Sequence, residues 1–128
     1  MTDNTLQLRL HTIVLRVRNL KASRAWYEEK LGMRVLYTDP HYRLISLGLE
    51  GESRLTLWEL REGEVPTETA KEMAYPVFLS QHARRDHREL TARGAVTEPV
   101  EDFAHGLRIF WIRDPDDHRL CVIEFLPD

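Results

Sequence analysis

Residues 14–33 read VLRVRNLKASRAWYEEKLGM and indicate a strand that leads directly into a short helix. Apolar and polar residues alternate over most of residues 8–17, which is typical of a half-buried strand. Asn19 is a suitable N-terminal cap, and the apolar residues after it recur at helical spacing. Gly32 supplies a residue that can adopt positive φ where the helix ends. We therefore predict a strand at 8–17 and a helix at 20–31.

Three more strands are predicted before residue 61. They are separated by Asp39-Pro40 and by Glu50-Gly51, both of which are turn signals. The predicted strands are 34–38, 42–49 and 54–60. The first half of the chain therefore has the order βαβββ.

The same order then begins again. Residues 61–72 are charged, contain Pro66 and lack periodicity, so we interpret them as a surface linker. After the linker we predict a strand at 75–80, a helix at 83–93 before Gly94, and strands at 95–97, 106–113 and 119–126. Residues 6–60 and 73–126 are thus two βαβββ half-repeats.

A weak internal repeat supports this division. Sliding the chain by 63 residues places Val14 on Val77 and Leu15 on Phe78, and one deletion brings Gly32 onto Gly94. Neither half has enough elements to cover its own apolar face, so the two halves should share one core. With 128 residues, 42% of them hydrophobic, we predict a single α+β domain over residues 1–128.

Composition argues against several partners. The net charge is −3 and the arginines are interleaved with acids, so we expect no nucleic acid partner. The longest apolar runs are far shorter than the roughly 20 residues that span a bilayer, so we expect no membrane partner. The single cysteine, Cys121, cannot form an internal disulfide and no secretory leader opens the sequence, so we expect a cytoplasmic protein.

Two motifs resemble the vicinal-oxygen-chelate superfamily of glyoxalases, bleomycin-resistance proteins and extradiol dioxygenases. In that family a strand ending in Val-x-Asp-Leu leads into a helix of the form Ser-x-x-Phe-Tyr-x-x-x-Leu-Gly, and here Asn19 replaces the Asp and Trp26 the Phe. Residues 114–118 are similar to the family's Asp-Pro-Asp-Gly-Asn turn, with Asp117 at the glycine, where it should adopt positive φ. The resemblance covers nearly the whole chain. It implies a homodimer and a cupped, mostly antiparallel mixed sheet with helices on its convex side.

The resemblance also implies where a metal would be held. Metal-dependent members bind one divalent cation through four side chains of the concave side, typically His and Glu. Those positions fall on Thr12, Thr56, Tyr75 and Cys121, and none of them keeps a family ligand. We therefore predict no metal cofactor, and a divalent metal held by non-standard ligands remains the alternative.

Three other residues stand close to the vacated positions. His11 is one residue from Thr12, while Glu59 and Glu124 are each three residues from Thr56 and Cys121. Side chains alternate between the two faces of a strand, so all three should project to the opposite face. They should not replace the missing ligands.

The concave face should instead bind an organic molecule. Aromatic side chains with a few hydroxyls and a guanidinium suit a flat, aromatic or partly anionic ligand. The predicted ligand-binding residues are Thr12, Arg16, Thr56, Trp58, Tyr75, Val77, Trp111 and Cys121. The aromatic residues among them are equally suited to filling the cup or a dimer interface.

Three functions follow from these alternatives. The first is a metal-independent small-molecule binder, similar to the bleomycin-resistance branch. The second is a metal-dependent glyoxalase, lyase or ring-cleaving dioxygenase, and the third is a dimeric scaffold whose cup is filled. The sequence assigns no catalytic residue and names no ligand, because fold alone does not assign function.

Overall fold

The computed structural model describes residues 6–7, 9–51, 53–65 and 74–127. The first half contains β1 (Ile13–Val17), α1 (Leu20–Leu31), β2 (Arg34–Asp39), β3 (Leu44–Gly48) and β4 (Arg54–Glu59). The second half contains β5 (Val77–Leu79), α3 (Ala83–Ala92), β6 (Val96–Thr97), β7 (Glu101–Phe103), β8 (Leu107–Arg113) and β9 (Arg119–Phe125). The predicted element order is confirmed, with β7 as an addition.

The observed strands differ from the predicted strands in their boundaries and in one addition. The strand predicted at 8–17 is observed only at Ile13–Val17. Residues 9–12 precede β1, and Leu8 lies outside the described residues. The short strand β7 was not predicted, since its three exposed residues show no apolar alternation. Residues 66–73 lie outside the described residues, so the limits of the linker and of the second half-repeat stay a prediction.

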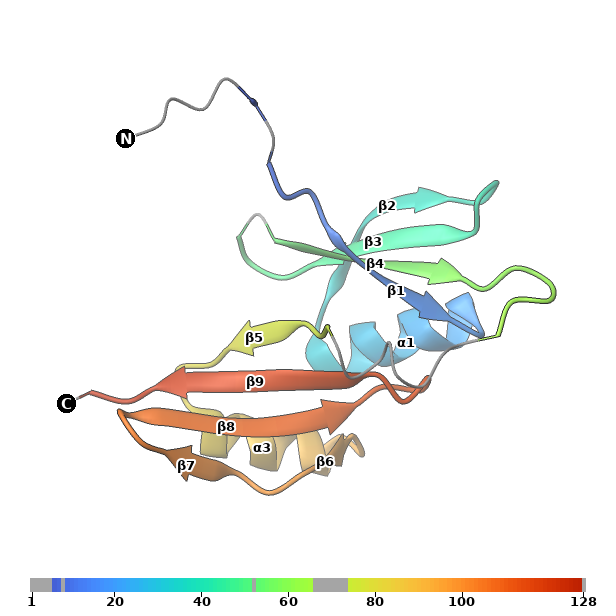
Figure 1. Cartoon of the computed structure of the whole chain (residues 1–128). Coiled ribbons are helices and arrows are strands. Elements are labelled where there is room, and N and C mark those ends of the chain that lie inside the picture. Colours follow the sequence, from blue (N-terminus) through green and yellow to red (C-terminus); the bar gives the residue numbers. More distant parts are fainter. Residues whose placement is uncertain (1–5, 8, 52, 66–73, 128) are drawn as a thin grey trace.

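The strands form two mixed sheets, one for each half. The first has the order β1-β4-β3-β2, and the second has the order β5-β9-β8-β6 with β7 also paired to β8. The pairs β1–β4 and β5–β9 are parallel, and every other pair is antiparallel. In Figure 1 the sheet of the first half lies above that of the second, and α3 lies behind the second sheet at the level of β8. It packs against β6, β8 and β9.

One hydrophobic core joins the halves, as the sequence predicts. Buried side chains of the first half, such as Leu57 and Tyr27, belong to the same cluster as Phe110 and Leu120 of the second. On β1 the buried residues Leu15 and Val17 alternate with side chains that face away from the core. We call the face of each sheet that points away from this core its open face.

The helix ends confirm the local predictions. The Asn19 side chain accepts a hydrogen bond from the backbone N–H of Ala22 at the start of α1. Gly32 follows α1 with φ +68°, a conformation in which glycine carries no Cβ penalty. Neither helix among the described residues is long and apolar enough to cross a bilayer.

Candidate functional site

The first group of predicted residues lies on the open face of β1 and β4. The parallel register pairs Val14 with Thr56 and Arg16 with Trp58. The hydroxyl oxygens of Thr12 and Thr56 are 2.8 Å apart, and the hydroxyl oxygens of Thr56 and Ser46 are also 2.8 Å apart. Two of the predicted residues, Thr12 and Thr56, are therefore hydrogen-bonded to each other. Ser46, which was not predicted, extends this short chain of hydroxyl groups.

Arg16 and Trp58 form a stacked pair beside these hydroxyls. The guanidinium carbon of Arg16 lies 4.1 Å from the centroid of the Trp58 ring, within range of a cation–π contact. Nη1 and Nη2 of Arg16 donate to the two carboxylate oxygens of Glu64 at 3.0 and 2.7 Å. The hydrogen bond from Arg16 lowers the pKa of Glu64 below its ordinary value, and the hydrogen bond from the backbone of Arg61 acts in the same direction.

The second group lies on the open face of β5, β9 and β8. Register places Val77, Cys121 and Trp111 in one row across these three strands. The rings of Tyr75 and Trp111 meet edge to face with centroids 4.8 Å apart. The four predicted residues of the second half therefore lie together.

The guanidinium group of Arg119 lies against the Trp111 ring. The Arg119 guanidinium carbon lies 4.1 Å from the Trp111 centroid, and Arg119 donates two hydrogen bonds of 3.0 Å to Glu98. Each open face thus has a tryptophan with an arginine against its ring, and a glutamate from a neighbouring loop neutralises that arginine.

Cys121 is buried at the centre of the second group. Desolvation raises the pKa of the Cys121 thiol, and the charge of Arg119 opposes that effect. The thiolate is the form that attacks electrophiles and binds metals. At neutral pH Cys121 is therefore a small apolar side chain.

Glu59 and Glu124 lie on the helix-covered faces, as strand alternation predicts. Glu59 Oε2 accepts a hydrogen bond of 2.9 Å from the backbone N–H of Leu20, at the start of α1. Glu124 Oε1 accepts one of 2.8 Å from the backbone N–H of Ala83, at the start of α3. Each glutamate satisfies a free N–H group of the helix in its own half, so neither reaches the open face.

The four positions that the resemblance assigns to a metal do not fit one. Their side chains offer three hydroxyl groups and one thiol, and they include no carboxylate or imidazole. The hydroxyls of Thr12 and Thr56 are already bonded to each other. His11, the third of the residues close in sequence to these positions, is exposed and precedes β1.

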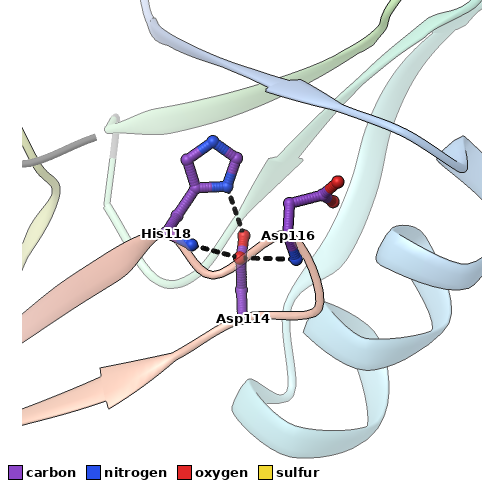
Figure 2. A group of neighbouring side chains, drawn as sticks. All are labelled: Asp114, Asp116 and His118. Carbon is purple, nitrogen blue, oxygen red and sulfur yellow. Dashed lines mark hydrogen bonds and ion pairs between the residues drawn. The ribbon is translucent and has the colours of Figure 1, made fainter. Parts of the chain in front are cut away.

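Asp114, Asp116 and His118 form another group of possible ligands, with their ligand atoms within 4.8 Å of one another. Figure 2 shows that Asp114 lies between the other two. Its Oδ1 accepts hydrogen bonds from the backbone N–H groups of Asp116 and His118 at 3.0 and 2.8 Å. Its Oδ2 accepts one from the Tyr27 hydroxyl at 2.7 Å and lies 2.9 Å from His118 Nδ1.

This arrangement has a structural role. Both oxygens of Asp114 are occupied by donors of the chain itself, and Asp116 Oδ1 accepts a further hydrogen bond from the backbone N–H of Arg18. Asp117 adopts φ +66°, which confirms the prediction for the glycine position of the turn. The turn between β8 and β9 therefore fastens the second half to Tyr27 of α1 and to Arg18, which lies between β1 and α1.

A cleft of about 670 Å³ lies between β5 of the second half and the β3–β4 turn of the first half, with Ile13 of β1 at its side. Its lining is mostly apolar and includes Ile13, Met33, Leu55, Val77, Phe78 and Leu79. Val77 is the predicted site residue that lines this cleft. Ile13 of β1 and Val77 of β5, each on an outer strand of its sheet, both contribute to the lining of this cleft.

Sequence reasoning missed four residues of the two groups. Arg119 has the same strand parity as Cys121, so alternation alone was enough to place it on the open face. Ser46 lies on a strand whose register with β4 was not known from sequence. Glu64 and Glu98 lie outside the predicted strands, where no periodicity indicates the direction of a side chain.

Comparison with solved structures supports the fold. A glyoxalase family protein from Enterococcus faecalis is 24% identical over 91% of this chain and 97% of that one, with a TM-score of 0.74. TnmS3, an antibiotic binding protein from Streptomyces sp. CB03234, is 17% identical over 94% and 98%, with a TM-score of 0.79. A superfamily member from Sphaerobacter thermophilus is 20% identical over 92% and 98%, with a TM-score of 0.77. At these identities the likeness shows the fold alone.

Comparison with sequences identifies the family. No curated protein matches the chain. The model of the glyoxalase/bleomycin resistance protein/dioxygenase superfamily matches residues 9–122, which include both motifs of the predicted resemblance. The chain belongs to the glyoxalase/bleomycin resistance protein/dioxygenase superfamily.

Proposed function

We propose that this protein binds a small organic molecule on the open faces of its two sheets without the help of a metal. The observation that carries the proposal is the hydrogen bond of 2.8 Å between Thr12 and Thr56, at two positions that the resemblance assigns to metal ligands. Neutral hydroxyl groups hold a divalent cation poorly, whereas they orient a polar organic group well.

The neighbouring side chains suit an aromatic ligand. Trp58, Tyr75 and Trp111 offer flat apolar surface, and Arg16 and Arg119 lie directly against two of these rings. Ring stacking supplies the apolar burial, and the hydroxyls and guanidinium groups fix the orientation. TnmS3, whose fold is similar, is described as an antibiotic binding protein, and this supports a binding role for the present chain.

We further propose that two copies of the chain form the working unit. The outer strands β1 and β5 expose Ile13, Val14, Val77 and Leu79, with exposed fractions of 42%, 45%, 51% and 71%. Apolar side chains on unpaired edge strands favour association with a second chain. Cross-linking and light scattering test this. A strictly monomeric protein at micromolar concentration contradicts it.

Calorimetric titration with planar aromatic compounds tests the binding proposal. We expect at least one of them to bind with micromolar to millimolar affinity, and Trp111→Leu to weaken its binding about tenfold, because stacked rings contribute strongly to ligand burial. Lys21→Ala, at the start of α1, is the control and should leave the affinity unchanged. A panel in which no aromatic compound binds overturns the proposal.

Metal analysis tests the alternative of a metal-dependent enzyme. The proposal expects no stoichiometric Ni, Zn, Mn or Fe in protein purified without chelators, and no change in melting temperature when these ions are added. A tightly bound stoichiometric metal that Thr56→Val removes favours the enzyme instead.

We also propose that the protein is cytoplasmic, where the buried thiol of Cys121 stays reduced.

A further inference from the structure

Arg16 holds a carboxylate of the chain itself in the geometry that an organic acid would take. Two of its nitrogens face the two oxygens of Glu64, and its guanidinium plane rests on Trp58. Nε and Nη2 also donate to the backbone oxygens of Trp58 and Glu59, both at 3.3 Å. These contacts hold the planar fork in place before any ligand arrives, and bidentate forks of this kind recognise carboxylates specifically.

Glu64 is attached to the chain differently from Glu98, its counterpart on the other open face. Glu98 donates its backbone N–H to the carbonyl oxygen of Trp111, which anchors it to the edge of the second sheet. Glu64 donates its backbone N–H to Arg61, only three residues earlier, in a turn outside both sheets. Glu64 is therefore held mainly by Arg16 and by its own turn, and it can leave without breaking a sheet.

The ion pair between Arg16 and Glu64 is also exposed to water. Their side chains are 29% and 34% exposed. Solvent-exposed ion pairs contribute little to stability, because water and salt screen them and both side chains lose freedom. The Arg61 guanidinium carbon also lies 5.1 Å from the centroid of the Trp58 ring. A ligand whose ring replaces Arg61 at Trp58 and whose carboxylate binds Arg16 can therefore compete with Glu64.

We propose that Arg16 is the carboxylate-recognition residue of the site and that Glu64 is its internal competitor, occupying the guanidinium until an aromatic carboxylate displaces it. This inference rests on the proposed binding function and names the ligand class. In the bound state the ligand carboxylate takes the two N–H groups that Glu64 releases. Binding of the acid is thus coupled to release of the turn at residues 61–64.

A matched pair of probes tests the proposal. 2-Naphthoate carries the carboxylate, and 2-naphthamide is its neutral analogue of nearly the same shape. In calorimetric titrations at fixed salt concentration, Glu64→Gln should strengthen naphthoate binding about threefold and leave naphthamide binding unchanged, because only the acid competes with Glu64. Arg16→Gln should lower naphthoate affinity to that of naphthamide, and Glu64→Gln should have no further effect in that variant.

The control is Glu28→Gln on α1, where the glutamate pairs with Arg24 away from the open faces. It changes the net charge by the same amount and should leave both affinities unchanged. Naphthamide binding by Arg16→Gln verifies that this variant is folded. If wild-type protein binds naphthamide and Glu64→Gln does not improve naphthoate binding, the competitor role is wrong and the binding function stands. If the wild type binds neither probe nor any other aromatic compound, the binding function fails and this inference fails with it.

Discussion

Lys30 and Arg93 each donate a hydrogen bond to the main-chain carbonyl oxygen of the other. They are 63 residues apart, the same offset that aligns Val14 with Val77 in the sequence. Lys30 lies in the last turn of α1, and Arg93 directly follows α3. Their reciprocal contact joins the C-terminal ends of the two helices.

The reciprocal contact gives a first prediction. Lys30→Ala and Arg93→Ala should each lower the free energy of unfolding by about 0.5 kcal/mol, because a cation near a helix C-terminus stabilises its free carbonyl groups. Urea denaturation measures the change. Lys21→Ala, at the opposite end of α1, is the control. A loss for Lys21→Ala as large as for Lys30→Ala contradicts the explanation.

Tyr27 gives the second prediction, because its hydroxyl donates to Asp114 across the two halves. Tyr27 is fully buried, so Tyr27→Phe leaves a carboxylate oxygen short of one donor. We expect a loss of about 1–3 kcal/mol in the free energy of unfolding by denaturant titration. Tyr42→Phe, at a position that is 61% exposed, should change stability little. Equal effects of the two substitutions would show that the Asp114 contact contributes nothing.

The third prediction concerns alkaline pH. Burial, and then the charge of Asp114, raises the pKa of Tyr27 well above its ordinary value of 10.0. The unfolded chain therefore releases this proton at lower pH than the folded chain does. The contribution of Tyr27 to the free energy of unfolding is fully present below pH 10 and decreases as the pH rises above 10. Unfolding measured between pH 9 and 11, a range of about two units around the tyrosine pKa, should show a steeper loss for the wild type than for Tyr27→Phe.

Ser23 gives a prediction of the opposite sign. Its hydroxyl oxygen is buried within α1 and has no hydrogen-bond partner among the described residues. A buried polar group without a partner costs free energy, so Ser23→Ala should raise the free energy of unfolding by up to about 1 kcal/mol. Ser53→Ala, at an exposed position, is the control for the substitution itself. A destabilised Ser23→Ala variant would reveal a hidden partner for this hydroxyl.

The fifth prediction concerns the start of α3. His82 precedes this helix without a side-chain cap, and Glu124 of β9 supplies the missing acceptor to Ala83. Glu124→Ala should cost about 1–2 kcal/mol, the usual effect of losing an N-terminal cap. Glu124→Gln keeps an acceptor oxygen and should cost less. Glu101→Ala, on the exposed strand β7, is the control, and thermal unfolding compares all three variants.

Local patterns in the sequence predicted the elements that depend on neighbouring residues. α1 runs from Leu20 to Leu31 as predicted, because Asn19 caps it and Gly32 ends it within the segment itself. Strand parity also placed Glu59 and Glu124 on the helix-covered faces, since alternation is a property of the strand alone. The strand β7 escaped prediction because only its pairing with β8 makes it a strand.

The sequence by itself determined the two βαβββ halves and the superfamily. Those features depend on residue identity and on short-range periodicity. Only the tertiary structure decided that Glu64 pairs with Arg16 and that Asp114 joins Tyr27 to the turn before β9. Each contact spans 48 or 87 residues, and its partners are brought together by sheet register and by the shared core. No local pattern in the sequence predicts these two contacts, because packing between distant segments produces them.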